Sequence, residues 1–220
     1  EKPRPVAFFS LEMTAEQIAR RILCTESQIP ESVFWNRSFQ YSDITRMTGA
    51  VNAILNAKIF IDPTGGLTIS ELRAKARRLK AQKNIELIVI DYLQLMSGSG
   101  YGKGSENRQQ VVSDISRSLK IMAKELNVPV LCLSQLSRGP ESRTDKRPML
   151  SDLRESGAIE QDADSVMFLY RDEYYNENTE DKGVAECIVA KNRHGETGTV
   201  KLQWLPQYQT FTDREWKHAE

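Results

Sequence analysis

Histidine and cysteine are scarce in this chain, with two and three copies among 220 residues. His194 and His218 lack Cys, Asp or Glu neighbours at the spacing of metal ligands, which argues against a histidine-based metal site. The cysteines are odd in number and scattered through apolar segments, at positions Cys24, Cys132 and Cys187. That distribution favours reduced core thiols over a disulfide framework, so we expect a reducing, cytoplasmic environment.

Net charge and long apolar runs are also missing. Thirty basic and thirty acidic residues cancel, so any contact with nucleic acid must come from local clusters. No apolar run reaches membrane-spanning length, and the start, Glu1-Lys-Pro-Arg-Pro5, is neither a signal peptide nor an initiator methionine. We expect no membrane contact, and a chain cut from a longer one.

What remains is the composition of an ordinary globular protein, with 40% hydrophobic and 27% charged residues. Apolar strands alternate with amphipathic helices, which predicts an α/β fold: one domain over residues 1–220 with a mostly parallel sheet covered on both faces. Strands are predicted at residues 5–10, 58–61, 87–91, 128–134 and 165–171, and helices at residues 14–27, 42–56, 68–83 and 105–127. The helices that begin at Thr14 and Thr68 start with capping-box sequences.

Three further segments interrupt this alternation. Residues 185–191 and 199–204 flank a turn with two glycines, which predicts an antiparallel hairpin at the edge of the sheet. Residues 97–106 are rich in Gly and Ser, and residues 137–151 carry Arg138, Arg143, Lys146 and Arg147. Both follow predicted central strands, where open α/β sheets bind ligands. We therefore interpret them as functional loops, although solvated surface loops share this composition.

The segment Glu86-Leu-Ile-Val-Ile-Asp91 predicts a buried strand that ends in an acid. An aspartate in that place commonly holds the water shell of a nucleotide-bound Mg²⁺, which is the Walker B role. An apolar strand can also end in Asp simply because a turn follows. The first hypothesis is a nucleotide-driven machine with Asp91 as its metal-site acid.

Two more polar residues follow predicted strands at the same edge. Glu12 comes after the first strand and has the chemistry to polarise an attacking water. Gln135 comes after the fourth and has the chemistry to hydrogen-bond a terminal phosphate. The alternatives are that Glu12 favours a helix amino terminus and Gln135 caps a turn.

Lys191 and Arg193 alternate along the strand that enters the hairpin, so both side chains can point toward one anion. From an edge hairpin such a pair could act on a neighbouring subunit as an arginine finger. Protection of a sheet edge by charge would give the same pattern.

A complete phosphate-binding loop is not found in the sequence. Residues 98–105 resemble one, but Gly104 follows Lys103 where the Walker A pattern needs Ser or Thr, and Ser97 stands in the place of its first glycine. No Gly-Lys-Ser or Gly-Lys-Thr occurs elsewhere. The chain thus carries the second half of a nucleotide site without the first.

These residues together resemble one family, the RecA-like ATPase domain of DnaB-type replicative DNA helicases. The resemblance covers nearly the whole chain, through Phe9-Ser-Leu-Glu-Met13, Ile88-Val-Ile-Asp-Tyr-Leu-Gln-Leu95, Glu106-Asn-Arg-Gln-Gln110, Leu133-Ser-Gln-Leu-Ser-Arg138, Asp145-Lys-Arg-Pro148, Ser151-Asp-Leu-Arg-Glu-Ser-Gly157, Glu160-Gln-Asp-Ala-Asp164, Phe168-Leu-Tyr-Arg171 and Ala190-Lys-Asn-Arg193. It implies a hexameric ring that encircles single-stranded DNA, hydrolyses ATP with Mg²⁺, moves 5′ to 3′ and unwinds duplex, with a primase and a helicase loader as partners.

The resemblance also implies roles for single residues. Glu12 would be the catalytic base, Asp91 the Walker B acid, Gln135 the phosphate sensor, Lys191 and Arg193 the finger that reaches a neighbouring subunit, and Arg21 a residue near the nucleotide. Arg154, Glu155 and Gly157 would contact DNA in the channel. A glycine there lets a backbone N–H approach a phosphate closely, while Glu155 is expected to orient neighbouring donors.

The family's Walker A loop and amino-terminal domain are expected upstream of Glu1. Without the Walker lysine, ATP affinity loses a main support, so this chain alone should not hydrolyse ATP appreciably. Two alternatives stay open: a RecA-like recombinase or clock-type ATPase, and a catalytically dead DNA-binding or assembly module.

Overall fold

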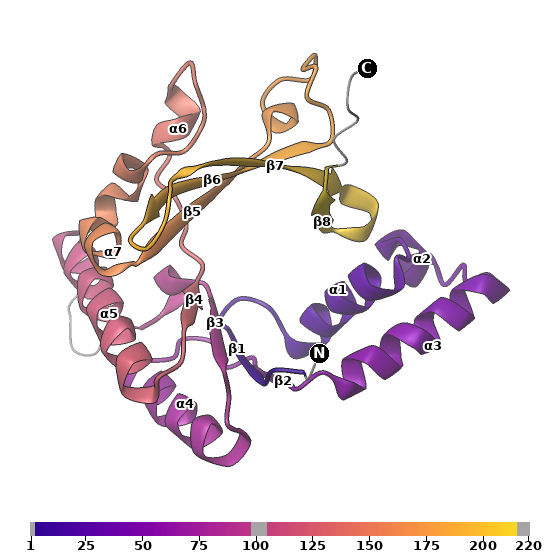
Figure 1. Cartoon of the computed structure of the whole chain (residues 1–220), viewed down its shortest axis with the longest axis horizontal. Coiled ribbons are helices and arrows are strands. Elements are labelled where there is room, and N and C mark those ends of the chain that lie inside the picture. The colour runs from indigo at the N-terminus through magenta and orange to yellow at the C-terminus, as the bar shows by residue number, and fades with distance from the viewer. Residues whose placement is uncertain (1–2, 98–104, 215–220) are drawn as a thin grey trace.

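The computed structural model describes residues 3–97 and 105–214, without the side chains of residues 105–108 and 154–156. It contains two four-stranded sheets (Figure 1). The first is wholly parallel and has the strand order β2-β1-β3-β4, where β1 is Val6–Ser10, β2 is Ile59–Asp62, β3 is Leu87–Asp91 and β4 is Val130–Cys132. All four agree with predicted strands to within about two residues, which confirms the α/β class.

Helices connect these parallel strands in the predicted order. They are α1 (Ala15–Ser27), α3 (Tyr41–Asn56), α4 (Ile69–Lys83) and α5 (Ser105–Leu126). Both predicted capping boxes are present, because the Thr14 hydroxyl accepts from the Gln17 N–H and the Thr68 hydroxyl from the Glu71 N–H, each at 3.3 Å. A short helix that the sequence did not predict, α2 (Glu31–Asn36), lies between α1 and α3.

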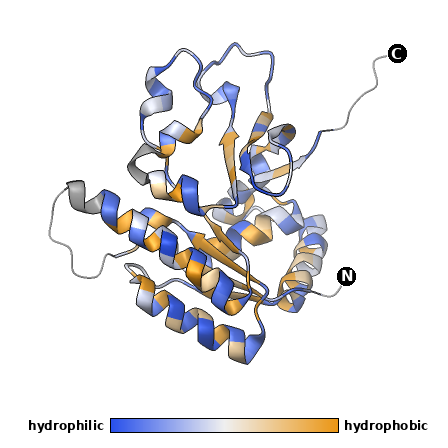
Figure 2. Cartoon of the chain, turned by 60° about the vertical axis from the view of Figure 1, so that its left-hand side comes forward, coloured by the Kyte–Doolittle hydropathy of each residue, from blue (hydrophilic) through white to orange (hydrophobic). Residues whose placement is uncertain are grey.

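Helices α4 and α5 cover one face of the parallel sheet. Figure 2 shows the sheet as mainly hydrophobic strands beside helices of mixed hydropathy. Ile88 and Ile90 of β3 are 0% exposed within the main hydrophobic cluster, to which Val130 and Cys132 also pack. The intervening β4 residue Leu131 faces the other way and is 42% exposed. The expected cover on both faces is therefore incomplete at β4 in the part of the chain that the structure describes.

The second sheet corrects the predicted place of the last strands. Strand β5 (Ser165–Tyr170) pairs antiparallel with β6 (Val184–Asn192), followed by β7 (Gly198–Leu205) and β8 (Thr210–Asp213). The hairpin is thus part of a separate sheet and not an edge of the parallel one. Buried and exposed residues alternate strictly along β5, as in antiparallel strands with one open face, whereas parallel strands are usually buried on both faces.

Short helical segments follow several of the strands. The single-turn segments η1 (Leu93–Leu95), η3 (Asp172–Tyr174) and η4 (Pro206–Tyr208) come after β3, β5 and β7. The chain between β4 and β5, which joins the two sheets, contains the helix α6 (Gly139–Ser142), the longer 3₁₀ segment η2 (Leu150–Ser156) and the helix α7 (Gly157–Asp162). A smaller hydrophobic cluster of Leu153, Val166 and Phe168 lies under them, and Ile159 of α7 packs against both this cluster and the main one.

Two of the expected absences can be compared with the structure. Cys24, Cys132 and Cys187 are all free, which confirms the predicted thiols. Among the described residues, no helix combines the length and the apolar character needed to cross a membrane. The glycine-rich loop predicted at residues 97–106 lies almost entirely outside the described residues.

Candidate functional site

The candidate site lies where β1, β3 and β4 end together at one edge of the parallel sheet. In the sheet register, Ser10 lies beside Asp91. Backbone hydrogen bonds continue past the strands, from the Leu11 N–H to the Asp91 carbonyl at 2.7 Å and from the Leu133 N–H to the Ile90 carbonyl at 2.9 Å. The ends of β1, β3 and β4 therefore meet at one edge, as the sequence predicted, and the strand order puts the loops after β1 and β4 on either side of β3.

Asp91 sits in an environment that disfavours its own negative charge. Its half-buried position raises the pKa of the carboxyl above the ordinary value, first by desolvation and then through the negative charge of Glu12. The positive charge of Arg21 on α1 acts in the opposite direction and lowers this pKa. The structure thus brings Glu12, Asp91 and Arg21 within electrostatic reach of one another.

This pair of carboxylates fits a Mg²⁺ ion held mostly through water. No group of three or more His, Cys, Asp or Glu side chains suited to a metal ion occurs among the described residues. Mg²⁺ needs no such group, because it retains several waters and is commonly bound by one or two carboxylates together with phosphates. A cation beside Asp91 would also relieve the repulsion that raises the pKa of this carboxyl.

The turn that carries Glu12 is fixed by Ser10. The Ser10 side chain is fully buried, and its hydroxyl donates to the Met13 carbonyl at 2.8 Å and accepts from the Met13 N–H at 3.0 Å. Glu12 itself is exposed between these two anchored residues. The hydroxyl therefore restricts the backbone while it leaves the Glu12 carboxylate accessible.

Gln94 plays a similar part for Gln135, a role that the sequence reasoning missed. The Gln94 amide donates to the Ser134 hydroxyl at 2.9 Å and to the Gln135 carbonyl at 3.2 Å, and its oxygen accepts from the Gln135 N–H at 3.1 Å. The exposed Gln135 side chain remains available. The only signal in the sequence was an amide side chain among the apolar residues 93–96.

Lys191 and Arg193 point in the same direction, as predicted, and meet the carboxyl end of α7. The Lys191 ammonium donates to the carbonyls of Glu160 at 2.5 Å and Ala163 at 2.8 Å. The Arg193 guanidinium donates to the Gln161 carbonyl at 2.7 Å. Cations at a helix carboxyl terminus satisfy its free carbonyls and its dipole. In a single chain both side chains are thus helix caps, and neither lies beside Asp91 in any contact of the described residues.

The predicted DNA contacts fall at the junction of η2 and α7. Arg154 and Glu155 belong to η2, and their side chains lie outside the described part. Gly157 is exposed, with helical backbone angles (φ −51°, ψ −24°), and a Cβ atom built on it meets nothing within 4 Å. Packing against the described side chains, which do not include those of residues 154–156, therefore gives no reason for a glycine at that position.

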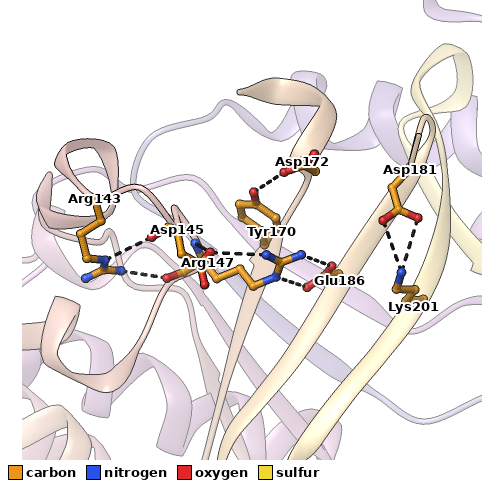
Figure 3. Close-up of polar contacts among 8 residues, drawn as sticks. All are labelled: Arg143, Asp145, Arg147, Tyr170, Asp172, Asp181, Glu186 and Lys201. Carbon is orange, nitrogen blue, oxygen red and sulfur yellow. Dashed lines mark hydrogen bonds and ion pairs between the residues drawn. The ribbon is translucent and has the colours of Figure 1, made fainter. Parts of the chain in front are cut away.

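The basic loop at residues 137–151, predicted to be functional, has two of its four cations paired with carboxylates of the chain. The Arg147 guanidinium forms two hydrogen bonds of 2.8 Å with Glu186 of β6 and lies 4.8 Å from the centroid of the Tyr170 ring (Figure 3). Arg143 pairs with Asp152 at 2.7 Å and 2.8 Å.

The two remaining cations of this loop differ. Lys146 donates to the Glu141 carbonyl at 2.9 Å. Arg138 is exposed, and its side chain forms no hydrogen bond or ion pair within the described residues. Among the described residues, Lys146 and Arg138 therefore have no carboxylate partner, and their charges are left for an external anion.

This chain is similar in sequence to proteins of known function. The sequence matches the family described as DnaB-like helicase C terminal domain over residues 1–213. It is 52% identical over 215 residues to the replicative DNA helicase DnaB of Geobacillus stearothermophilus, and 53% identical over 210 residues to the replicative DNA helicase DnaC of Bacillus subtilis (strain 168). These alignments cover 98% and 96% of this chain but 47% and 46% of the relatives. The chain thus spans about half the length of the curated relatives it matches.

A solved structure agrees with the sequence relatives. A DnaB-like replicative helicase, described together with its interactions with primase, superposes with a TM-score of 0.91 at 40% identity, over 96% of this chain and 51% of that one. The parallel sheet, the separate antiparallel sheet and the order of the motifs are therefore those of a RecA-like ATPase domain. The chain belongs to the DnaB-like helicase C-terminal domain family.

Proposed function

We propose that this chain is the motor portion of a hexameric replicative DNA helicase, which couples ATP hydrolysis to 5′ to 3′ movement on single-stranded DNA and to duplex unwinding. The observation that carries the proposal is the shared edge of β1, β3 and β4, where Glu12, Asp91 and Gln135 follow neighbouring strand ends. Phosphoryl transfer needs an acid for the metal site, a residue that orients water and a phosphate sensor. The names of the close relatives support the same activity.

On the nucleotide side, each residue has one task. Asp91 would hold the water shell of Mg²⁺, which would supply positive charge for the phosphates of ATP. Glu12 orients the attacking water and accepts its proton. Gln135 donates its amide N–H to the terminal phosphate, from a backbone fixed by Gln94. The positive charge of Arg21 lies near the nucleotide.

Lys191 and Arg193 complete the site from a neighbouring subunit. An arginine placed on transferring phosphate oxygens stabilises the charge of the transition state. To act in this way both side chains leave the carbonyls of α7, which they cap in the single chain.

On the DNA side, Arg154, Glu155 and Gly157 contact the sugar-phosphate backbone. The open space at Gly157 supports this part of the proposal, because a glycine without a packing reason suits a backbone N–H that approaches a phosphate closely. Arg154 adds charge without sequence readout. Primase, with which the solved relative interacts, and a helicase loader are the proposed protein partners, and the cytoplasm is the proposed compartment.

The phosphate-binding loop has to come from outside these 220 residues, because the sequence holds no Gly-Lys-Ser or Gly-Lys-Thr. We therefore expect the isolated chain to hydrolyse no appreciable ATP. A longer protein that contains this chain together with an upstream Walker A loop should do so.

The test is Mg²⁺-dependent ATP hydrolysis by both forms, with and without single-stranded DNA. We expect turnover by the longer protein alone, stimulation by DNA, and a loss of about 10²-fold or more in kcat on Asp91→Asn, which removes the metal-site charge. Gln207→Ala, at an exposed residue of η4, is the control that should leave turnover unchanged. An inactive longer protein that still binds DNA would favour the dead binding module instead.

A further inference from the structure

A buried ion pair lies between the loop after β4 and the proposed DNA-contact segment. The Asp152 side chain is 4% exposed and accepts hydrogen bonds from both terminal nitrogens of Arg143, at 2.7 Å and 2.8 Å. It also accepts from the Met149 N–H at 2.8 Å. Arg143 lowers the pKa of this carboxyl, so Asp152 is charged at neutral pH.

The position of Asp152 in the chain makes this pair informative. Its backbone carbonyl accepts from the Ser137 N–H at 3.2 Å, and Ser137 follows the proposed sensor Gln135 by two positions. Asp152 also precedes Arg154 by two positions, at the start of the proposed DNA-contact segment. One residue therefore connects the loop that leaves the phosphate-sensing strand to the segment that contacts DNA.

The Asp152 side chain is closely packed as well as paired with Arg143. A Cβ atom built on Gly139 would lie 2.9 Å from the Asp152 carboxylate and 3.3 Å from the Ser137 hydroxyl. The next residue, Leu153, is buried in the smaller hydrophobic cluster. Asp152 is thus held by contacts to the loop after β4 and to η2, so we expect a displacement of one to move the other.

A second ion pair on the same loop provides a comparison. Arg147 and Glu186 also form two hydrogen bonds of 2.8 Å, and the Glu186 side chain is 9% exposed (Figure 3). That pair ties the loop to β6, and among the described residues its side chains make no hydrogen bond to Ser137 or Asp152, although the Arg147 backbone carbonyl accepts from Arg143 at 2.8 Å. It matches the first pair in chemistry and differs in what it connects.

We propose that Asp152, held by Arg143, is a positioning residue that couples the loop after Gln135 to the proposed DNA-contact segment at residues 154–157. Through this coupling, DNA binding changes the rate of ATP hydrolysis, and ATP hydrolysis changes DNA binding. This inference rests on the proposed helicase function. It assigns no catalytic role to either residue, because neither lies at the Asp91 edge in any contact of the described residues.

The experiment uses the full-length protein and compares the rate of ATP hydrolysis with and without single-stranded DNA. Asp152→Asn keeps the shape of the side chain and removes its charge. We expect the DNA-independent rate and the Kd for an oligonucleotide to stay within about threefold of wild type, while stimulation by DNA falls about tenfold. Arg143→Lys, which loses the two-pronged geometry but keeps the charge, should fall in the same direction.

Glu186→Gln is the matched control, since it neutralises the comparable pair and should leave the stimulation ratio unchanged. A purely structural role for Asp152 would instead lower both rates and the Tm together, or lower the Tm with a normal ratio, and either result overturns the inference. Should Asp152→Asn fail to fold, Arg143→Lys decides by the same ratio. A wild-type protein without DNA-stimulated hydrolysis would refute the proposed function itself, which separates the two failures.

Discussion

Gln94 shows how one side chain can fix the backbone of a loop that follows a neighbouring strand. Its amide makes three hydrogen bonds of 2.9 to 3.2 Å to Ser134 and to the backbone of Gln135. These bonds are the side-chain contacts that join η1 to the start of the loop after β4. The direction of the Gln135 amide thus depends on a residue 41 positions earlier in the chain.

We predict that Gln94→Ala lowers the kcat of ATP hydrolysis by about ten- to a hundredfold with little change in KM for ATP, because displacement of a positioned group by about 1 Å has effects of this size. Steady-state kinetics of the full-length protein give both constants. If kcat stays at the wild-type value, Gln135 does not depend on this anchor. Gln207→Ala serves again as the exposed amide control.

Sequence reasoning found the residues whose place follows from strand ends alone. Asp91, Glu12 and Gln135 were predicted because parallel strands align their carboxyl ends. Gln94 and Asp152 were not predicted. Both contact the loop after β4 from distant positions in the sequence, and no local sequence pattern indicates such contacts. For Lys191 and Arg193 the shared direction was predicted, but the carboxyl end of α7 as their common partner was not.

At the scale of elements, α4 and α5 are joined by a cluster of charges. Glu125 of α5 accepts from the Arg77 guanidinium at 2.6 Å and 2.9 Å and from Arg73 at 2.9 Å. Hydrogen bonds from Arg77 and then Arg73 lower the pKa of Glu125 from 4.5 to about 2. This cluster holds together the two helices that cover the buried face of the parallel sheet.

The cluster predicts a pH-dependent contribution to stability. Because the pKa of Glu125 is lower in the folded protein than in the unfolded chain, its contribution is fully present above about pH 5 and is lost as the pH falls from 4.5 toward about 2. Glu125→Gln should therefore lower the Tm at pH 7 by about 1–3 °C, and this difference should shrink as the pH approaches 3. Thermal unfolding across that range measures it.

Glu86→Gln is the control for this experiment. Its pair with Arg4 spans 3.8 Å between side chains that are 41% and 83% exposed, so its loss should not change the Tm measurably at any pH. A Tm difference for Glu125→Gln that stayed constant with pH would mean that packing, and not charge, accounts for the effect.

Elements were predictable where local signals suffice. The capping boxes at Thr14 and Thr68 gave two helix starts, and β-branched apolar runs gave the parallel strands. The pairing partner of β5 was not predictable from its apolar residues, because sheet pairing is a property of long-range contacts. Its five consecutive apolar residues from Val166 to Tyr170 resemble a strand buried on both faces, and only the structure shows that Met167 and Leu169 are exposed.

At the scale of the whole molecule, the observed contacts of Arg193 compete with its proposed action on a neighbouring subunit. The Arg193 guanidinium donates to the Gln161 carbonyl at 2.7 Å and pairs with Asp164 at 3.4 Å. Leaving the carbonyl costs about 1.5–3 kcal/mol, the typical range for hydrogen bonds of charged groups, and leaving the half-exposed Asp164 adds about 0–1 kcal/mol. An arginine finger contributes about 10³- to 10⁵-fold in kcat, or about 4–7 kcal/mol. In the transition state, the proposed contact with the phosphate would therefore outweigh the cost of leaving α7. Helix capping in the single chain is therefore compatible with action in a ring.

We predict that inactive subunits of two kinds restore each other within one ring. Glu12→Ala and Arg193→Ala should each lower kcat by about 10³-fold when every subunit carries the change. In hexamers assembled from equal amounts of both, about a quarter of the sites combine an intact Glu12 with an intact Arg193 from the neighbour, and activity should recover accordingly. ATP hydrolysis by co-expressed, doubly tagged assemblies measures this recovery.

Glu12→Ala mixed with Asp91→Ala is the control, because the proposal places both residues in the same subunit's half of the site and no mixture of these two can complete it. Recovery in the first mixture without recovery in the second requires that Arg193 act across the subunit boundary. If neither mixture recovers, Arg193 does not act on a neighbouring subunit and keeps its contact with α7. The proposed contact between Arg193 of one subunit and the ATP of the next would then be wrong.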